Sequence, residues 1–358
     1  MDQTLRLSQF YRILFLLFVF CLSFCCANKK LDFYELMGQR QDAWKLILQK
    51  DLPLLEKFYQ LEQSFPAKQP FSDIPKCIHF IWVGPKAFPQ ESIKNIYSWI
   101  EKHPDFQVYF WTDRERPLPH LMMKIRYVQD FDWQYLRQQF LESDNYAEQS
   151  DLLRYEVLYQ EGGIYVDHDV ECFQSLMPLI QSCDLLCGLE PPHKPIGEVS
   201  ITVCNNLIAS CPSHPILKKT INHVLQKWDR YKLVYSGADV DAITKRVYYR
   251  TFVSFDDAVK ELMSGLPYKN RVLPAGYFNK IGKKFGIYAD HFYAGSWFDH
   301  ESSFEKNVRQ RLVKICKKNN QILLVIAVFF VLIGVFIFSL AFQLRSLQKQ
   351  LNGLQNKK

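Results

Sequence analysis

Three Asp-x-Asp triplets are the residues of this sequence best suited to bind a divalent cation. They occupy residues 130–132, 167–169 and 239–241. A chain of this length contains about one such triplet by chance, so the pattern alone carries little information. Only the triplet at 167–169 directly follows a short apolar segment, residues 164–166, which is itself preceded by Gly162 and Gly163. This context selects it as the candidate site.

The position of Asp167 and Asp169 predicts where their carboxylates point. At the end of a strand, side chains two residues apart face the same side, so both can reach one cation while His168 points away. Carboxylate oxygens suit Mg²⁺ or Mn²⁺, and a substrate diphosphate and water would fill the open positions. The sequence therefore predicts Asp167 and Asp169 as ligands of Mn²⁺ or Mg²⁺.

Alternating strands and helices surround this triplet. Apolar runs and helical periodicity predict strands at residues 76–84, 107–113 and 164–170, and helices at 89–102 and 145–160. This order predicts an α/β sheet with a substantial parallel portion, whose ligands bind beyond the carboxyl ends of the strands. Ahead of it, residues 31–65 carry apolar side chains at helical spacing, which predicts a helical hairpin.

Three motifs together resemble the DXD sugar-binding region of glycosyltransferase family 32. They are I-H-F-I-W at residues 78–82, S-D-x-x-R at 150–154 and G-G-x-Y-x-D-x-D at 162–169. The family includes the yeast initiating α-1,6-mannosyltransferase and the inositol-phosphoceramide mannosyltransferases, and the glucosylating domain of the large clostridial cytotoxins is a close relative. The resemblance implies a GT-A-like nucleotide-diphospho-sugar transferase domain with a mixed, largely parallel sheet.

The resemblance also implies roles for single residues. Trp82 matches a tryptophan that stacks on the uracil of the donor; the alternative is an aromatic side chain in the core. Asp151 and Arg154 match a pair that grips the donor sugar hydroxyls; the alternative is an i,i+3 ion pair on a solvated helix face. Asp167 is implied to contact the ribose and the cation, and Asp169 to ligate the cation directly.

Residues 204–215 resemble the family's asparagine-to-His-Pro segment. The match implies Asn205 as the active-site asparagine, which binds substrate, and His214 is predicted to start a helix rather than to bind a ligand. The family usually carries Thr-Gly-Pro further along, whereas residues 249–255 contain no Gly-Pro. Because that segment lies near the acceptor side, the identity of the acceptor is not carried over.

Residues 291–297 resemble the element that closes over the diphosphate in this family. A histidine there can ligate the cation, which implies His291 as a third metal ligand. Ser296 and Trp297 can donate hydrogen bonds to phosphate oxygens and are implied to bind substrate.

The charge of the chain is concentrated at its ends. The formal net charge is +7, but residues 306–358 hold ten basic and no acidic side chains. Residues 31–305 hold 30 basic and 36 acidic side chains. A basic face for nucleic acid is therefore not expected on the folded body. The ten cysteines form no CxxC pair, which favours free thiols in a reducing compartment.

Two apolar segments predict membrane attachment. Residues 322–342 are 21 consecutive uncharged residues, enough for a helix to cross the hydrocarbon layer of about 30 Å. Residues 13–27 follow Arg6 and Arg12, the layout of a secretory signal or a short signal anchor. More basic residues precede the second segment than follow it, which favours the cytoplasm for the preceding domain.

The predicted organisation is therefore a hydrophobic signal or signal anchor at residues 1–28, a helical extension at 31–72, a glycosyltransferase domain at 73–303, a transmembrane helix at 321–343 and a short amphipathic basic tail at 344–358.

The predicted function is a membrane-anchored, metal-dependent, retaining glycosyltransferase. It would move a hexose from a nucleotide-diphospho-sugar to a lipid, glycan or protein acceptor, with UDP favoured by Trp82 and GDP as the other option. Two alternatives are a non-catalytic membrane-tethered sugar or nucleotide-sugar binding module and a metal-dependent phosphohydrolase.

Overall fold

The computed structural model describes residues 32–64, 73–193, 199–264 and 268–295. The predicted signal or anchor, the predicted transmembrane helix, the basic tail, Ser296 and Trp297 lie outside the described residues. Within the described ranges, every helix is too short or too polar to cross a membrane.

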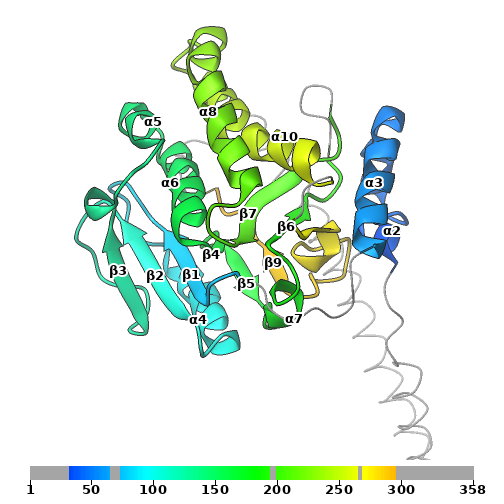
Figure 1. Cartoon of the computed structure of the whole chain (residues 1–358), viewed down its shortest axis with the longest axis horizontal. Helices are drawn as coiled ribbons and strands as arrows, with labels where there is room; N and C mark the ends of the chain where they lie inside the picture. Colours follow the sequence, from blue (N-terminus) through cyan, green and yellow to red (C-terminus); the bar gives the residue numbers. More distant parts are fainter. Residues whose placement is uncertain (1–31, 65–72, 194–198, 265–267, 296–358) are drawn as a thin grey trace, which may run out of the picture.

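A seven-stranded sheet forms the centre of the described part of the chain (Figure 1). Its strand order is β3-β2-β1-β4-β7-β6-β8, and β7 alone runs antiparallel to its two neighbours, β4 and β6. The sheet thus confirms the predicted mixed, largely parallel α/β architecture. Its strands are β1 (Cys77–Ile81), β2 (Gln107–Thr112), β3 (Met123–Tyr127), β4 (Gly163–Val166), β6 (Leu185–Leu189), β7 (Val203–Ser210) and β8 (Asn270–Leu273).

The strand predicted at residues 164–170 is two strands. β4 ends at Val166, and the backbone N–H of Val170 then donates to the carbonyl of Asp167 at 3.1 Å, which closes a turn. Beyond this turn β5 (Val170–Cys172) pairs with β9 (Ala289–His291) in a separate two-stranded sheet. The single-strand prediction was wrong because an apolar run does not reveal where the chain leaves one sheet for another. The Asp-x-Asp triplet lies in this turn.

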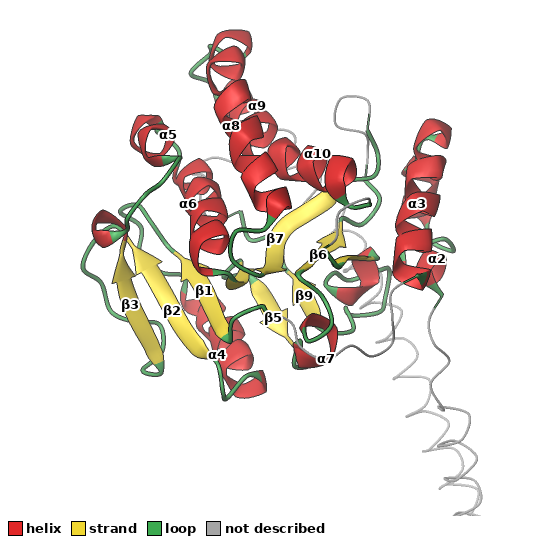
Figure 2. Ribbon diagram, in the orientation of Figure 1, coloured by secondary structure: helices red, strands yellow, loops and turns green. Residues whose placement is uncertain are grey.

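Helices cover both faces of the central sheet (Figure 2). Each face has its own apolar cluster, one containing Leu152 and Leu158 of α6 and the other Ile96 and Trp99 of α4. Burying one such side chain contributes about 1.5–3 kcal/mol, so the two clusters fix the helices against the sheet. The first face carries α6 (Tyr146–Glu161), α8 (Pro215–Val234) and α10 (Val253–Leu262); the second carries α4 (Ile93–Lys102) and α7 (Met177–Ile180); α5 (Arg137–Glu142) and α9 (Val240–Val247) are shorter helices.

The N-terminal extension is helical but is not a simple hairpin. α2 (Phe33–Leu36) is a single turn that ends before Gly38, whose φ of 81° suits glycine and interrupts the helix. Two 3-10 turns, Asp42–Leu46 and Gln49–Asp51, lead to α3 (Leu52–Gln63). α3 contacts β8, where Arg271 pairs with Glu62 at 2.9 Å. The extension is therefore attached to the edge of the sheet away from β3.

Candidate functional site

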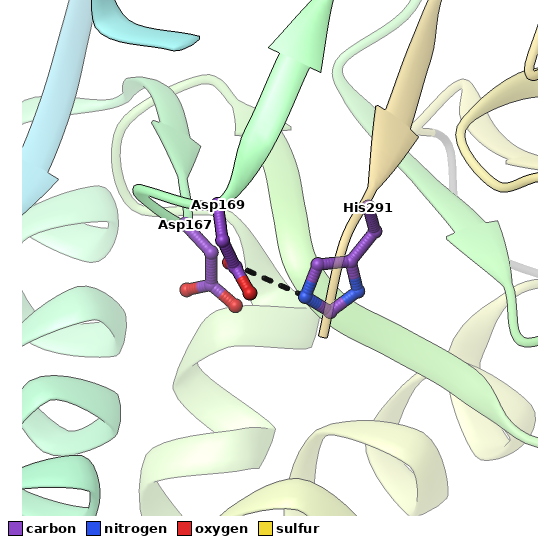
Figure 3. A group of neighbouring side chains, drawn as sticks. All are labelled: Asp167, Asp169 and His291. Atoms are coloured by element: carbon purple, nitrogen blue, oxygen red, sulfur yellow. Dashed lines mark ion pairs between the residues drawn. The ribbon is translucent and has the colours of Figure 1, made fainter. Parts of the chain in front are cut away.

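Asp167, Asp169 and His291 converge where the central sheet meets the small one (Figure 3). One potential ligand atom from each lies within 4.8 Å of the others. Both aspartates come from the turn after β4, and His291 is the last residue of β9, opposite Val170. Two carboxylates and an imidazole form a donor set that fits Mn²⁺ or Mg²⁺. The predicted convergence of these three residues is therefore observed.

Asp169 and His291 form a buried, oppositely charged pair. Nε2 of His291 lies 3.4 Å from Oδ1 of Asp169 (Figure 3). Burial would raise the pKa of Asp169, but His291 holds it well below the usual range. Burial likewise lowers the pKa of His291, but the carboxylate of Asp169 raises it to about 9. With this raised pKa, His291 carries a positive charge beside Asp169 at neutral pH.

Arg154 connects the Asp-x-Asp turn to helix α6. Its guanidinium pairs with Asp151 at 3.0 Å and with Asp167 at 2.9 Å, and its side chain is 5% exposed. It also donates to the hydroxyl of Tyr165 at 2.7 Å and packs 3.9 Å from the centre of that ring. The Asp151–Arg154 pair does have i,i+3 spacing, but it is buried, so the alternative of a solvated surface pair is wrong.

Asp151 is held by three different elements. Besides Arg154, it accepts a hydrogen bond from the Asn205 amide at 3.2 Å and from the Thr251 hydroxyl at 2.5 Å. Asn205 also donates to Tyr155 at 2.9 Å. The structure therefore brings Asp151, Arg154, Asn205 and Asp167 into one hydrogen-bonded group next to the candidate metal site.

Thr251 is a residue of this group that the sequence did not indicate. It belongs to a π-helical turn, Tyr248–Phe252, between α9 and α10. Such turns occur often at functional sites. The segment is the one in which the family's Gly-Pro is missing, and no motif marks a lone threonine there. Only the fold, which packs this turn against α6, reveals its contact with Asp151.

Trp82 does not line this group. Its side chain is 1% exposed and belongs to the core cluster that contains α4. The indole N–H donates to the carbonyl of Lys86 at 2.9 Å, and the ring packs edge-to-face on His168 with centroids 5.0 Å apart. The position of Trp82 corresponds to the alternative interpretation, a core aromatic, and leaves no open ring face for a base.

His168 and His214 have structural positions. Nδ1 of His168 hydrogen-bonds Ser92 Oγ at 2.8 Å, and the His168 carbonyl accepts from Asn95 at 3.1 Å, so the middle of the triplet ties the turn to the start of α4. His214 caps α8 by accepting from the N–H of Ile216 at 3.2 Å, which confirms the prediction for that residue.

The helix and strand that carry the motif are fixed by their ends. Asn145 caps α6 by accepting from the N–H groups of Ala147 and Glu148 at 2.9 and 3.1 Å. At the other end Gly162 and Gly163 have φ angles of 68° and 95°. A Cβ on Gly163 would lie 2.4 Å from the sulfur of Cys77. Both glycines are therefore required for the tight passage from α6 into β4.

Residues 89–185 match the family described as "Glycosyltransferase sugar-binding region containing DXD motif". This range runs from Pro89, shortly before α4, to the first residue of β6 and contains α6 and the Asp-x-Asp turn. This match confirms the resemblance to the DXD sugar-binding region that the motifs predicted. The match and the mixed, mostly parallel sheet agree with the predicted GT-A-like glycosyltransferase domain.

Two curated proteins illustrate the similarity. "Subversion of eukaryotic traffic protein A" of Legionella pneumophila is 35% identical over 124 residues, which are 31% of this chain and 19% of that protein. "Inositol phosphoceramide mannosyltransferase 3" of Schizosaccharomyces pombe is 29% identical over 154 residues, 42% of this chain and 37% of that protein. The matched regions span well under half the length of these relatives.

Among solved structures, a "PaToxG Glycosyltransferase" matches with a TM-score of 0.42 and 21% identity, over 63% of this chain and 81% of that one. The UDP-bound glycosyltransferase domain from the YGT toxin matches with a TM-score of 0.40 and 10% identity, over 69% of this chain and 90% of that one.

Proposed function

We propose that the protein is a membrane-anchored, metal-dependent glycosyltransferase that moves a hexose from a nucleotide-diphospho-sugar with retention of configuration. One observation supports this most directly. The Asp167–Asp169–His291 cluster is joined through Arg154 to Asp151 and Asn205. A site for a cation and a set of groups able to bind sugar hydroxyls are therefore contiguous, as a nucleotide-sugar donor requires.

The proposed chemistry divides among these residues. Asp167, Asp169 and His291 would hold a divalent ion, which would supply Lewis-acid neutralisation of the departing diphosphate. Arg154 and Asp151 hold the donor sugar by ionic hydrogen bonds, a positioning contribution rather than a proton transfer. Retention follows if the acceptor attacks from the face on which the diphosphate departs and gives its proton to a diphosphate oxygen.

The donor and the acceptor are proposed only as classes. The preference for UDP depended on Trp82, and the burial of that ring removes the argument, so UDP- and GDP-sugars are candidates alike. Some relatives are named inositol phosphoceramide mannosyltransferases, so mannose as the sugar and a sphingolipid as the acceptor are among the first candidates. The apolar segments at residues 13–27 and 322–342 support membrane attachment, with the domain on the cytoplasmic side.

The direct experiment is a hydrolysis assay of the full chain in detergent with UDP-glucose, UDP-galactose, UDP-N-acetylglucosamine and GDP-mannose. We expect turnover of at least one donor with Mn²⁺ or Mg²⁺, and none after chelation. Asp169→Asn should abolish it, whereas Asp132→Asn, an exposed carboxyl of another triplet, should not.

Three results would contradict the proposal. Donor binding without any metal-dependent turnover would favour the non-catalytic binding module. Release of inorganic phosphate instead of free sugar would favour a phosphohydrolase. Turnover that survives Asp169→Asn unchanged would remove the role of the Asp-x-Asp turn.

A further inference from the structure

A fourth carboxylate, that of Glu190, lies at the same edge of the sheet as the Asp-x-Asp turn. β4 and β6 both run antiparallel to β7, so their carboxyl ends point the same way. Glu190 directly follows β6, and its N–H extends the pairing by donating to the carbonyl of Thr202 at 2.9 Å. Glu190 is therefore placed beside the start of β7, which carries Asn205.

The carboxylate of Glu190 is held by Tyr293 rather than by a cationic side chain. The phenol oxygen of Tyr293 lies 3.1 Å from Oε2 of Glu190 and 2.9 Å from Oδ1 of Asn279. One hydroxyl proton cannot serve both acceptors. Asn279 is 1% exposed, and within the described residues its Nδ2 has no hydrogen-bond partner.

Exchanging the amide oxygen and nitrogen of Asn279 removes the conflict at Tyr293, because the two atoms are assigned from the hydrogen-bond network. Nδ2 then donates to the Tyr293 oxygen, and the Tyr293 hydroxyl donates to Glu190. The result is a directed chain from Asn279 through Tyr293 that ends on the carboxylate. Such a chain fixes the orientation of the Glu190 carboxylate.

Tyr293 also connects Glu190 to the candidate metal site. Its φ of 52° lies in the left-handed region, which is rare for an aromatic residue and is maintained only where neighbouring contacts enforce it. Those contacts are with Asp169: the N–H of Phe292 donates to its carbonyl at 2.9 Å, and the N–H of Ala294 to its carboxylate at 2.6 Å. The Tyr293 ring centre is 4.0 Å from that of His291.

The charge of Glu190 raises the pKa of three neighbouring groups. Burial raises the pKa of Tyr293, and the Glu190 carboxylate raises it further. Burial also raises the pKa of Cys204, next to Asn205, and of Tyr248, in the turn that carries Thr251; in both cases Glu190 adds to the shift. Through Tyr293 and the start of β7, Glu190 is thus connected both to His291 and to the strand that carries Asn205.

The other carboxylates of the site are engaged differently. Asp167 and Asp169 form the cluster suited to a cation, and Asp151 is bound by Arg154, Asn205 and Thr251. Within the described residues, Glu190 forms no ion pair with a lysine or arginine. It is the carboxylate of this edge that remains available to oppose a positive charge on a substrate.

We propose that Glu190 is a catalytic carboxylate that faces the donor sugar and stabilises the positive charge developing at its anomeric carbon, and that Tyr293 is its positioning residue. The proposal rests on the proposed glycosyltransferase function. In the step, the bond between the anomeric carbon and the diphosphate oxygen breaks, and its electron pair leaves with the diphosphate. The acceptor oxygen bonds to that carbon, and its proton goes to a diphosphate oxygen. Glu190 forms no bond and takes no proton.

The test is Glu190→Gln, which keeps the size of the side chain and removes its charge. With the donor that wild type hydrolyses, we expect kcat to fall roughly 100-fold, as for the loss of one preorganised electrostatic contact. KM for the donor and the Kd values for Mn²⁺ and for UDP or GDP should stay within about twofold. Glu161→Gln, at the far end of α6 where Glu161 pairs with Arg126, is the matched control and should leave kcat unchanged.

Tyr293→Phe provides a second variant should Glu190→Gln fail to fold. It removes only the hydroxyl, and we expect kcat to fall roughly tenfold with unchanged Mn²⁺ affinity, since one hydrogen bond to a charged group is lost. In the double variant the Tyr293 effect should vanish, because the two residues act as one unit.

The outcomes separate this inference from the proposed function. If wild type turns over no donor, the proposed function itself is wrong. If wild type is active and Glu190→Gln matches it, the role of Glu190 is wrong. A loss of melting temperature or metal affinity parallel to the loss of kcat would assign Glu190 a structural role and likewise overturn the inference. Full activity of Tyr293→Phe would overturn the positioning role.

Discussion

Helix α6 contributes to two buried ion pairs one turn apart, and the two pairs have different structural roles. Glu148 pairs with Arg250 at 3.3 Å, and Asp151 pairs with Arg154 at 3.0 Å; all four side chains are 13% exposed or less. Arg250 otherwise contacts Trp228, donating to its carbonyl at 2.9 Å and packing over its ring. Arg154 otherwise contacts Asp167 of the Asp-x-Asp turn.

The difference lies in what each pair connects. The Glu148–Arg250 pair joins α6 to α8 and the π-helical turn, all within the layer of helices, and so fixes their packing. The Asp151–Arg154 pair joins α6 to the end of β4, where the sheet meets the candidate cation site. A buried charge pair is therefore no sign of function by itself. Its partners outside the pair distinguish a packing role from a role in the site.

The largest effect is expected on stability from Arg250→Ala. This change leaves the Glu148 carboxylate buried without its cation, which costs about 3–5 kcal/mol. Thermal denaturation should show a melting temperature lower by roughly 10 °C, while the folded fraction keeps a kcat within about threefold of wild type.

A paired replacement sharpens that prediction. Glu148→Gln combined with Arg250→Met removes both charges, so most of the lost stability should return. If Arg250→Ala instead abolished turnover in protein that is fully folded, the division between the two pairs would be wrong.

Arg154→Lys should have the next largest effect, and on activity. A single ammonium cannot contact Asp151 and Asp167 together as the guanidinium does. We expect kcat/KM for donor hydrolysis to fall about 100- to 1,000-fold, the range for loss of a preorganised charge contact. Arg250→Lys is the matched control, with a change below about fivefold. Equal losses in the two variants would contradict the comparison.

The two pairs also show what the sequence can and cannot reveal. Asp151, Arg154, Asp167 and Asp169 all belong to one stretch, residues 145–170, in which a capped helix, two glycines and a short strand set their relative positions. A local motif is sufficient to predict such a group. The α/β order and the parallel strands were readable from the same kind of local periodicity.

The other side of the site comes from distant parts of the chain. Thr251, Glu190 and Tyr293 meet the motif only after β7 is inserted antiparallel between β4 and β6 and the π-helical turn packs on α6. No pattern along the chain encodes those contacts. Trp82 shows the reverse error, because a motif match gave the residue a role that tertiary burial does not support.

The protonation of His291 allows a test of the candidate cation site, which Arg154 contacts through Asp167. Its pKa is raised to about 9 by Asp169, so the metal-free protein holds this proton at neutral pH, and a ligating imidazole must release it. Apparent Mn²⁺ affinity should therefore rise about tenfold per pH unit, or roughly 100-fold from pH 6.5 to 8.5.

Isothermal titration calorimetry at pH 7 in two buffers of different ionisation enthalpy measures the same event, with about one proton released per ion bound. His291→Gln should bind the ion more weakly and release no proton. A pH-independent affinity in wild type would mean that His291 is not a ligand. His223 of α8, a buried histidine paired with the half-exposed Glu261 at 3.4 Å, offers the control variant His223→Gln.

Thr251→Val should produce the smallest effect and tests how far the functional group extends beyond the motif. The change keeps the shape of the side chain but removes the hydroxyl, which lies 2.5 Å from Asp151 and 2.8 Å from the carbonyl of Val247. Asp151 retains Arg154 and Asn205, so kcat/KM should fall only about tenfold, in line with about 1.5 kcal/mol for one hydrogen bond to a charged group. Thr251→Ser, which keeps the donor, should recover most of the activity.

Ser254 offers a control in the same layer of helices, because its hydroxyl donates to the carbonyl of Arg250. Ser254→Ala should change kcat/KM by less than twofold. A tenfold loss in this variant would mean that activity depends on the packing of the turn and not on the contact with Asp151.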